Sequence, residues 1–522
     1  MKQTDEEQIE KEAKVKNPLL NYLPQNSQEM VDLALKCKDW ATMHGACMRS
    51  KINFSRDQLQ YAPFAMLPSP FPRDLFEKAC RLQPLINELM FSVAINDEFL
   101  LKTLERLVDV DPFLARLLRI YRTVLSEGVG QDIFLGLIRS DYMIEKSQNG
   151  EYKLSMVEVN TIAAGFGWMG PVSGMIHKFV LSELDADEHI PKLPVNNALE
   201  AITDGMHEAW MHYQSSYKAP SSVIMIIVED VSYNICDQRF HEFELAKKNP
   251  KVRTIRRTLT QVGEQGWLDN SDSKSRLKIG ETEVAVIYFR CGYAPEQYPT
   301  EKEWEARLLI ERSLAIKCPS IRCHLAGSKK IQQILSKEGM IDTFLQSQTE
   351  DKESNEKSKK RKDDILALCD TFTGLYSLDL DEEGDRNAAM GIANPLLYVL
   401  KPQREGGGNN IYGEDVAKEL TKLGRTKERE SFILMKLIKP PIIDNFINRP
   451  GHGDQIRLEP TICELGIFGA YIGSLKSRKL RSSSQAGHML RVKGYGVNEG
   501  GVASGLGALD SPLLVEQLTS IS

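Results

Sequence analysis

The segment KPQREGGGNN, residues 401–410, places a lysine, an arginine and a glutamate beside three consecutive glycines. It directly follows the apolar run LLYVL, which predicts a strand that ends near Lys401. Bare glycine backbone after a strand brings peptide N–H groups close to phosphate oxygens. Glu405 would repel a phosphate unless a cation lay between them, and Mg²⁺ is typically held by one or two carboxylates plus substrate phosphates. The segment therefore predicts a site for a phosphorylated ligand and magnesium, with a solvated glycine-rich turn as the alternative.

A second pair of oxygen ligands lies in the segment MVEVNTI, residues 156–162. Glu158 and Asn160 are two residues apart on a predicted strand, so both side chains point to the same face. An acid and an amide together suit a metal ion. The next segment, GFGWMG at 165–170, matches the dinucleotide pattern G-x-G-x-x-G and offers a nicotinamide oxidoreductase as an alternative. We disfavour it because the first strand of a dinucleotide fold is a buried apolar run, whereas MVEVNT alternates polar and apolar residues.

Two basic clusters accompany these acids. The segment AGSKKIQQ places Lys329 and Lys330 at the start of a predicted helix. The segment HMLRVKGYGVNEGGVASGLG places Arg491 and Lys493 two residues apart, before a glycine-rich stretch. A basic strand that leads into a long glycine-rich loop is typical of a mobile lid over an anionic substrate.

The elements that must position these residues indicate a mixed α/β fold. Apolar spacing at i, i+3 and i+4 predicts helices from about residue 28 to 140. The predicted strands are 156–162, 222–230, 284–290, 398–402, 432–438 and 462–472. The run SVIMIIVED at 222–230 is almost wholly apolar, which predicts a strand covered on both faces. Helix-compatible sequence between 230 and 283 then predicts a strand–helix–strand unit in the middle of the chain.

One segment, EDKESNEKSKKRKDD at 350–364, has 12 charged residues among its 15. This composition predicts a solvated loop or a disordered insert. A nuclear-targeting or polyanion-binding patch is the alternative, although acidic residues interrupt the basic run.

The composition of the whole chain favours a soluble, cytoplasmic protein. Of its 522 residues 42% are apolar and 26% are charged, and the formal net charge of −6 disfavours a nucleic-acid surface. Nine scattered cysteines, an odd number, are typical of reduced thiols in a cytosol. The N-terminus lacks the apolar core of a signal peptide, and no run of about 18 apolar residues predicts a membrane span.

Several of these motifs together resemble eukaryotic-type glutathione synthetase, a family of the ATP-grasp superfamily of carboxylate–amine ligases. The similarity runs from about residue 28 to the C-terminus. The motifs that carry it are DYM (141–143), EVNTI (158–162), NICDQR (234–239), YFRCGY (288–293), WEARLLIERS (304–313), LAGSKKIQQ (325–333), VLKPQREGGGNNIYGE (399–414), CELGIFG (463–469), and LRVKG followed by EGGVASG. The sixteen residues around the triple glycine are the most specific of them.

The resemblance implies an enzyme that joins γ-glutamylcysteine to glycine through an acyl phosphate, with ATP converted to ADP and phosphate. It implies a homodimer with a permuted ATP-grasp fold, a separate substrate-binding α/β lobe and a glycine-rich lid. The expected domains are a tail at 1–27, a helical region with the first ATP-grasp strands at 28–220, the substrate lobe at 221–325, and the nucleotide lobes and lid at 326–522.

The resemblance also assigns expected roles to single residues. The magnesium ligands are Glu158, Asn160 and Glu405, and the catalytic residues are Arg491, Lys401 and Glu405. The ATP-binding residues are Glu158, Lys329, Lys401, Gly406, Gly407, Gly408, Asn409, Asn410, Tyr412, Met435, Lys436, Leu437, Ile438, Glu464, Lys493 and Glu499. The residues that bind the peptide substrates are Arg139, Ser232, Tyr233, Asn234, Gln238, Arg290, Cys291, Gly292, Tyr293, Arg491, Val502 and Ala503.

The chain departs from the family pattern at a few positions. Ala163 and Gly165 stand where relatives usually carry serines in a substrate-contacting turn. Cys291 replaces an aspartate, and Lys436 with Leu437 replaces a Glu–Lys pair. These changes bear on affinity more than on the class of reaction. Two questions stay open: whether the acceptor is glycine, β-alanine or serine, and whether the chain is an inactive relative that serves as a binding scaffold.

Overall fold

The largest sheet of the fold has eight strands in the order β1-β17-β4-β20-β19-β18-β6-β7. It belongs to a computed structural model that describes residues 14–147, 149–271, 274–346, 355–372, 374–404, 408–452, 456–502 and 505–519. The strands of this sheet are β1 (Lys14–Val15), β4 (Phe64–Ala65), β6 (Ile133–Lys146), β7 (Tyr152–Asn160), β17 (Ile442–Asn448), β18 (Leu458–Ser474), β19 (Lys479–Gly494) and β20 (Gly507–Asp510). Its long central strands pair antiparallel with one another.

The register of this sheet brings charged residues from four strands into one region. Arg491 of β19 lies opposite Glu464 of β18. One strand further, β18 pairs with β6, and Asp141 of β6 lies opposite Glu158 of β7. The pairing of β6 with β7 is irregular next to Asp141, where β7 carries one extra residue. Such bulges commonly redirect side chains beside active sites.

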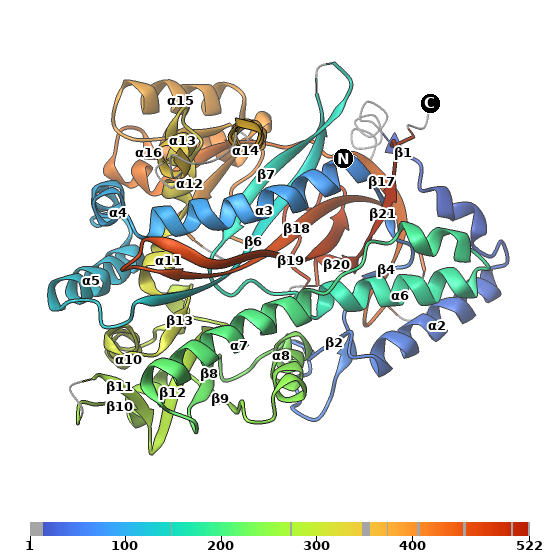
Figure 1. Cartoon of the computed structure of the whole chain (residues 1–522). Helices are drawn as coiled ribbons and strands as arrows, with labels where there is room; N and C mark the ends of the chain where they lie inside the picture. The colour runs from blue at the N-terminus through green and yellow to red at the C-terminus, as the bar shows by residue number, and fades with distance from the viewer. Residues whose placement is uncertain are drawn as a thin grey trace.

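Helices cover both faces of the eight-stranded sheet (Figure 1). The helix α3 (Arg73–Ala94) packs on β18 and β19 from one side, and α6 (Met169–Glu183) and α7 (Ala198–Tyr217) pack from the other. Glycines of β18 permit the close approach of α3, because a Cβ on Gly469 would lie 1.9 Å from Oδ1 of Asn87 and one on Gly473 would lie 2.3 Å from the ring of Phe91.

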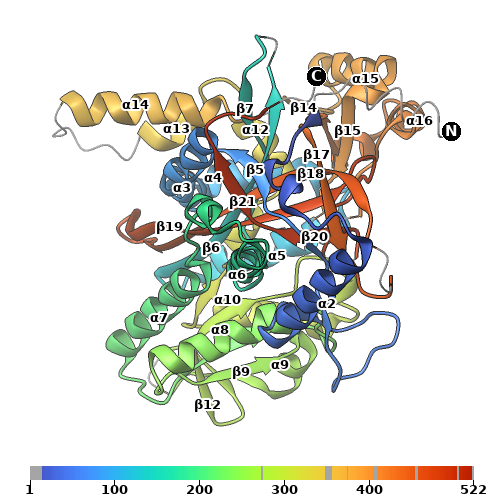
Figure 2. The ribbon, with the colours of Figure 1, turned by 90° about the vertical axis from the view of Figure 1, so that its right-hand side faces the viewer.

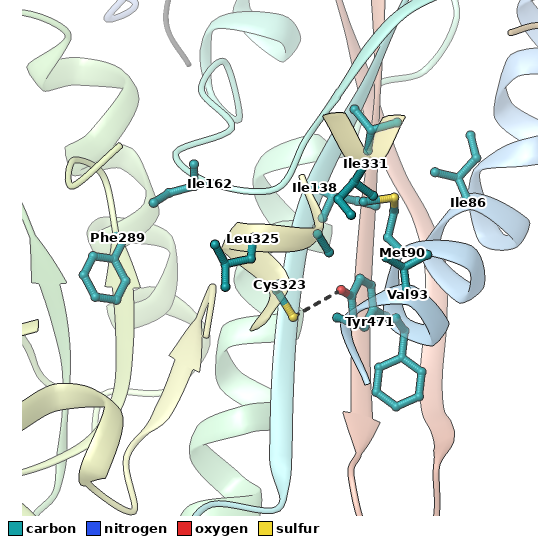
Figure 3. Packing of buried hydrophobic residues seen from close by; sticks show 14 of the residues in the cluster. Ile86, Met90, Val93, Ile138, Ile162, Phe289, Cys323, Leu325, Ile331 and Tyr471 are labelled. Carbon is teal, nitrogen blue, oxygen red and sulfur yellow. Dashed lines mark hydrogen bonds between the residues drawn. The ribbon is translucent and has the colours of Figure 1, made fainter. Parts of the chain in front are cut away.

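The main hydrophobic core lies between this sheet and α3, and it also includes buried residues from the segment 223–345. Figure 3 shows Met90 and Val93 of α3 beside Tyr471 of β18, whose hydroxyl bonds to the sulfur of Cys323 at 3.8 Å. Ile331 belongs to the same cluster. It lies on the short helix that also carries Lys329, so core packing fixes the helix that presents this lysine.

A second sheet of six strands carries the predicted substrate-binding residues. Its order is β10-β11-β12-β8-β9, and β13 pairs with β12. Its elements are β8 (Val223–Ile227), α8 (Ile235–Lys248), β9 (Thr254–Arg257), α9 (Leu259–Gln265), β10 (Gly266–Asp269), β11 (Arg276–Ile279), β12 (Thr282–Phe289), α10 (Glu301–Arg312) and β13 (Ile316–Cys318). The strand β8 is buried along its length between parallel β12 and β9, which confirms a strand covered on both sides. Both predicted strands are present, but the sequence between them forms β9, β10 and β11 in addition to helices.

A third, three-stranded sheet forms a small lobe at the end of the molecule opposite the six-stranded sheet (Figures 1 and 2). Its order is β14-β16-β15, and all pairs are antiparallel. Its elements are β14 (Leu375–Ser377), α15 (Glu382–Ala393), β15 (Tyr398–Pro402), α16 (Glu414–Leu423) and β16 (Phe432–Lys436). The strand β15 ends where KPQREGGGNN begins, as the sequence predicts.

The remaining elements connect these three sheets. The helices are α2 (Ser27–Met43), α4 (Asp97–Leu104), α5 (Pro112–Glu127), α11 (Ile321–Ala326), α12 (Lys329–Leu335), α13 (Met340–Gln346) and α14 (Asn355–Cys369). The short 3-10 helices are Pro18–Tyr22, Glu105–Leu107, Asp187–Lys192, Pro295–Gln297, Pro395–Leu397 and Lys427–Ser431. The short strands are β2 (Cys47–Met48), β3 (Gln60–Tyr61), β5 (Ser69–Pro72) and β21 (Pro512–Val515).

The structure confirms the mixed α/β class, and each predicted strand overlaps an observed one. Three local predictions are wrong. The segment from 230 to 283, expected to be helical, also contains the strands β9, β10 and β11. The helical region expected from 28 to 140 contains short strands at 47–72 and the long strand β6, which is buried on both faces and so lacks the alternation of a half-exposed strand. The described part of the segment 350–364 is helical, because Ile365 and Leu368 of α14 are buried and Arg361 pairs with Glu88 of α3 at 2.6 Å. In the described ranges, no helix is long and apolar enough to cross a membrane.

A buried carboxyl at the end of β20 provides a test of this packing by pH. Asp510 is fully buried, its Oδ2 accepts a hydrogen bond from Ser69 Oγ at 2.6 Å, and burial raises its pKa to about 7. Because the folded protein holds this proton more tightly than the unfolded chain, the associated stability is complete below the ordinary pKa of 3.8 and is lost as the pH rises through about 7.

We therefore expect wild type to lose stability relative to Asp510→Asn by roughly 1 kcal/mol per pH unit between about pH 4 and about pH 7, with little further change above. Urea unfolding of both proteins across this range measures the difference, in which groups that titrate alike in both proteins cancel. A difference in unfolding free energy that is independent of pH would contradict a neutral, buried Asp510.

Candidate active site

A cavity of about 740 Å³ lies between the eight-stranded sheet, called the central sheet below, and the small lobe. It brings together side chains from β6, β7, β18 and β19 with side chains from β15 and β16. The predicted site residues that line it are Arg139, Glu158, Asn160, Tyr293, Lys329, Lys401, Asn410, Tyr412, Met435, Lys436, Leu437, Ile438, Glu464, Arg491, Lys493 and Glu499. Eight lysines and arginines and three glutamates contribute to the described lining. This excess of positive charge suits an anionic ligand.

The other predicted residues lie elsewhere. Gly408, Asn409 and Val502 are described but do not line the cavity, and Val502 packs in a hydrophobic cluster. Glu405, Gly406, Gly407 and Ala503 lie outside the described residues. The predicted substrate-binding residues of the six-stranded lobe are described but do not line the cavity, and they are Ser232, Tyr233, Asn234, Gln238, Arg290, Cys291 and Gly292.

A largely buried ion pair lines the cavity. The Nζ of Lys329, at the first position of α12, lies 2.9 Å from Oε2 of Glu158 on β7. Lys401 approaches from β15, with its Nζ 3.4 Å from the carbonyl oxygen of Val157. Burial alone would raise the pKa of Glu158, but the charges of Lys329 and Lys401 outweigh it and hold the pKa below its usual range. Glu158 is therefore ionised at every physiological pH.

The predicted magnesium ligands Glu158 and Asn160 present oxygen atoms to the same cavity. The Nδ2 of Asn160 donates to Oδ2 of Asp141 at 3.0 Å, so the side-chain oxygen of Asn160 is the atom that can bind a cation. A buried carboxylate and an amide oxygen are ligands that Mg²⁺ accepts. The described residues contain no cluster of three His, Cys, Asp or Glu side chains that could bind a metal by themselves. Glu158 and Asn160 therefore fit a magnesium ion whose other ligands are water molecules or oxygen atoms of a bound substrate.

Asp141 is a site residue that the sequence analysis did not list. Its carboxylate is fully buried and accepts bonds from Nε and Nη2 of Arg139 at 2.6 and 2.7 Å, in addition to the bond from Asn160. It therefore fixes one predicted substrate ligand and one predicted metal ligand together. The two-residue spacing of Arg139 and Asp141 in the DYM region was the signal available, because it places both on one face of a strand.

The neighbouring strands β18 and β19 of the same sheet, with the segment that follows β19, also line the cavity. Arg491 forms a close ion pair with Glu464, and both side chains are largely buried. Burial alone would lower the pKa of Arg491, but the negative charges of Glu464 and Asp141 raise it above the usual value. The Nζ of Lys493 donates to the carbonyl oxygen of Asn498 at 2.6 Å, which holds the start of the glycine-rich segment against the cavity.

One end of the cavity is apolar. Val399, Met435 and Ile438 of the small lobe form a buried cluster, against which Met143 and Val157 of the central sheet pack. All five residues line the cavity. Apolar side chains contributed by both the sheet and the small lobe suit a planar aromatic group such as a purine. Of these five residues, only Met435 and Ile438 were in the sequence prediction.

The loop 161–168 links the cavity to the six-stranded lobe. Ala163 lines the cavity, and the backbone N–H groups of Phe166 and Trp168 each donate to Asp237 of α8 at 3.0 Å. Ala163 and Phe166 have φ values of +52° and +78°, a left-handed conformation that is strained for residues other than glycine. Asp237, paired with Arg290 at 3.1 Å, holds this strained loop in place.

The glycines of the same region have a packing role rather than a dinucleotide-binding one. A Cβ on Gly170 would lie 2.4 Å from the carbonyl oxygen of His488. In addition, β7 pairs antiparallel with β6 instead of forming the first strand of a parallel unit. Both observations disfavour the nicotinamide oxidoreductase.

Comparisons with known proteins show the family to which the chain belongs. The family model for the eukaryotic glutathione synthase ATP-binding domain matches residues 27–514. The glutathione synthetases of Homo sapiens and Xenopus laevis are both 41% identical to this chain, covering 94% of it and 98% and 97% of their own lengths. The chloroplastic glutathione synthetase of Arabidopsis thaliana is 38% identical, over 91% of this chain and 84% of its own.

A solved structure shares the fold. The apo form of a glutathione synthetase-like effector from Globodera pallida aligns with a TM-score of 0.74 and 22% identity, covering 95% of this chain and 99% of its own. The family model and the curated relatives each extend over most of the sequence. The chain therefore belongs to the eukaryotic glutathione synthetase family.

Proposed function

We propose that this chain uses ATP to join γ-glutamylcysteine to glycine, with release of ADP and phosphate. The observation that carries the proposal is the Glu158–Lys329 pair, which lies in a cationic cavity with an apolar end in a chain of this family. The apolar end at Met435 and Ile438 would hold the adenine, and Lys329, Lys401 and Lys493 would contact the phosphates.

The reaction needs activation of a carboxylate, because an oxide is too poor a leaving group for amide formation at neutral pH. Phosphorylation of the cysteinyl carboxylate would give an acyl phosphate that the glycine amine can attack. Phosphoryl transfer depends mainly on positioning and charge neutralisation. This explains a site of lysines, arginines and acids with no covalent nucleophile. Arg491, Lys401 and Glu405 are the proposed catalytic residues.

Magnesium would be held by Glu158, Asn160 and Glu405, and when bound it would neutralise phosphate charge and orient the phosphates. The chain's own side chains have separate tasks in this scheme. Lys329 and Lys401 orient the nucleotide, and Asp141 keeps Arg139 and Asn160 in position. The glycine-rich segment after Lys493, with Val502 and Ala503, is the proposed lid that keeps water from the acyl phosphate.

The remaining substrate ligands are proposed in the six-stranded lobe. Ser232, Tyr233, Asn234 and Gln238 would bind the dipeptide together with Arg139, Arg290 and the residues Cys291, Gly292 and Tyr293. We also propose a permuted ATP-grasp fold, the domain division at residues 27, 220 and 325, a homodimer and a cytoplasmic location. Light scattering of the purified chain tests the dimer.

The first experiment is coupled detection of ADP with ATP, magnesium and γ-glutamylcysteine, offered with glycine, β-alanine or serine in turn. We expect turnover that requires the dipeptide and prefers glycine. Preference for another acceptor would keep the reaction class and change the substrate. No ADP with any pair, from folded protein that still binds ATP, would favour an inactive scaffold instead.

A further inference from the structure

Arg256 of β9 joins two residues that the proposed function assigns to the dipeptide. Its Nη2 donates to Oγ of Ser232 at 3.0 Å and to Oε1 of Gln238 at 2.6 Å. Ser232 lies between β8 and α8, whereas Gln238 lies in the first turns of α8. One guanidinium therefore fixes the loop and the helix relative to each other. Arg256 was absent from the sequence prediction.

The guanidinium is itself held by a buried acid. Its Nη1 donates to Oε1 of Glu242 at 2.8 Å, and the side chains of Arg256 and Glu242 are 13% and 6% exposed. Glu242 lies one helical turn after Gln238, so both face β9 from the same side of α8. The other oxygen of Glu242 accepts from Arg239 at 2.6 Å and from Thr254 Oγ1 at 3.3 Å. Arg256 is thus oriented within a network of hydrogen bonds.

These bonds determine the hydrogen-bonding roles of Ser232 and Gln238. An arginine can only donate, so Oγ of Ser232 accepts from it and the serine hydroxyl hydrogen is directed to another acceptor. The oxygen of the Gln238 amide points to Arg256, while its Nε2 donates to Oδ1 of Asn234 at 2.8 Å. The orientation of that amide is therefore fixed by its two neighbours. A hydroxyl that is obliged to donate suits a carboxylate or carbonyl oxygen of a ligand.

The position of α8 connects this network to the cavity. Asp237, adjacent to Gln238, binds the loop 161–168, and Ala163 of that loop lines the cavity. We infer that Arg256 is a positioning residue of the dipeptide subsite, which makes Ser232 a hydrogen-bond donor and fixes Gln238 and Asn234 for contact with γ-glutamylcysteine. This inference rests on the proposed function.

The experiment compares Arg256→Gln with Arg257→Gln. Arg257 is the next residue of the same strand, and its Nε donates instead to Oε1 of Gln265 at 3.2 Å, so its replacement removes an equal charge without touching Ser232 or Gln238. With ATP and glycine saturating, we expect Arg256→Gln to raise the KM for γ-glutamylcysteine about 10- to 100-fold, by analogy with the loss of a residue that orients a metal ligand. We expect kcat and the KM for ATP to change less than about threefold, and Arg257→Gln to match wild type.

A double-mutant cycle tests whether Arg256 acts through Ser232. If it does, Ser232→Ala raises the dipeptide KM in wild type but adds little in Arg256→Gln, because effects of coupled residues are not additive. Full additivity, or no effect of Ser232→Ala alone, would overturn the positioning role in favour of direct binding by Arg256. Equal kinetics of Arg256→Gln and Arg257→Gln would also overturn it.

Two further variants keep the test decisive. Glu242→Gln removes the charge that holds Arg256 and retains the side-chain volume, and we expect it to raise the KM for γ-glutamylcysteine as well. It replaces Arg256→Gln in the test if that variant does not fold. Arg256→Lys should restore only part of the affinity, because an ammonium cannot reproduce the planar arrangement of donors. Absence of turnover in wild type would refute the proposed function, whereas normal wild-type turnover with an unaffected Glu242→Gln would refute this inference alone.

Discussion

Replacing Glu158 by glutamine is expected to lower kcat by more than about 100-fold while the protein stays folded. Loss of an outer residue that only orients a metal ligand already costs about 10- to 100-fold, and Glu158 is proposed as a ligand itself. Glutamine has the same shape and can still accept a hydrogen bond from Lys329. It is neutral, however, so it lacks the negative charge that would attract the magnesium ion. Because the pKa of Glu158 is held low, the effect should be the same across the neutral pH range.

The measurement is ADP release at increasing magnesium concentration, beside thermal unfolding with and without ATP. Glu151→Gln is the matched control, since Glu151 lies exposed at the tip of the hairpin that β6 and β7 form. We expect the control to behave as wild type. A Glu158→Gln enzyme with the kcat of wild type at the same magnesium concentration would remove Glu158 from the metal site.

Much of the site could be predicted from the sequence because its residues lie in short continuous segments. The strand β15, which contains Lys401, is mostly apolar and is followed by three glycines, and the basic spacing of Arg491 and Lys493 belongs to a long strand. These patterns are local, so they do not depend on which strands pair. The same holds for β8, whose continuous apolar run is the mark of a strand covered on both sides.

The residues that sequence reasoning missed depend on contacts between distant segments. Asp141 matters because β6 pairs with β7 in a register that places it opposite Glu158. Arg256 matters because β9 pairs with β8, and the Arg256 side chain contacts Gln238 and Glu242 of α8. The spacing of Arg139 and Asp141 indicates that both lie on one face of a strand, but it does not indicate which residues of other strands lie beside them. The strand β6 itself was hidden because Arg139 and Asp141 interrupt its apolar residues, and both of its faces are covered.

The two adjacent lysines of α12 are expected to have different roles, one in activity and one in stability. Lys329 and Lys330 are neighbours in sequence, yet Lys329 lies in the cavity beside Glu158, whereas Nζ of Lys330 lies 2.6 Å from Asp379, which follows β14 of the small lobe. Lys329→Gln should lower kcat/KM for ATP by roughly 100-fold or more, as expected when a fixed cation that stabilises developing charge is removed. Lys330→Gln should keep most of that activity and instead lower the free energy of unfolding by about 2 kcal/mol, because it leaves the largely buried Asp379 without its closest cation.

Steady-state kinetics and urea unfolding of both variants distinguish the two roles, and each variant is the control for the other. The same amide replaces the same ammonium one residue away, so a general effect of lost positive charge on this helix would change both proteins alike. Equal loss of activity in both would mean that α12 is simply displaced, which would undermine the assignment of Lys329 to the nucleotide. A stable Lys330→Gln protein would show instead that Asp379 finds sufficient compensation from Arg106, whose Nη1 lies 3.9 Å away. If Lys329→Gln alone loses activity, the cavity pair Glu158–Lys329 is part of the catalytic machinery and not only a buried ion pair.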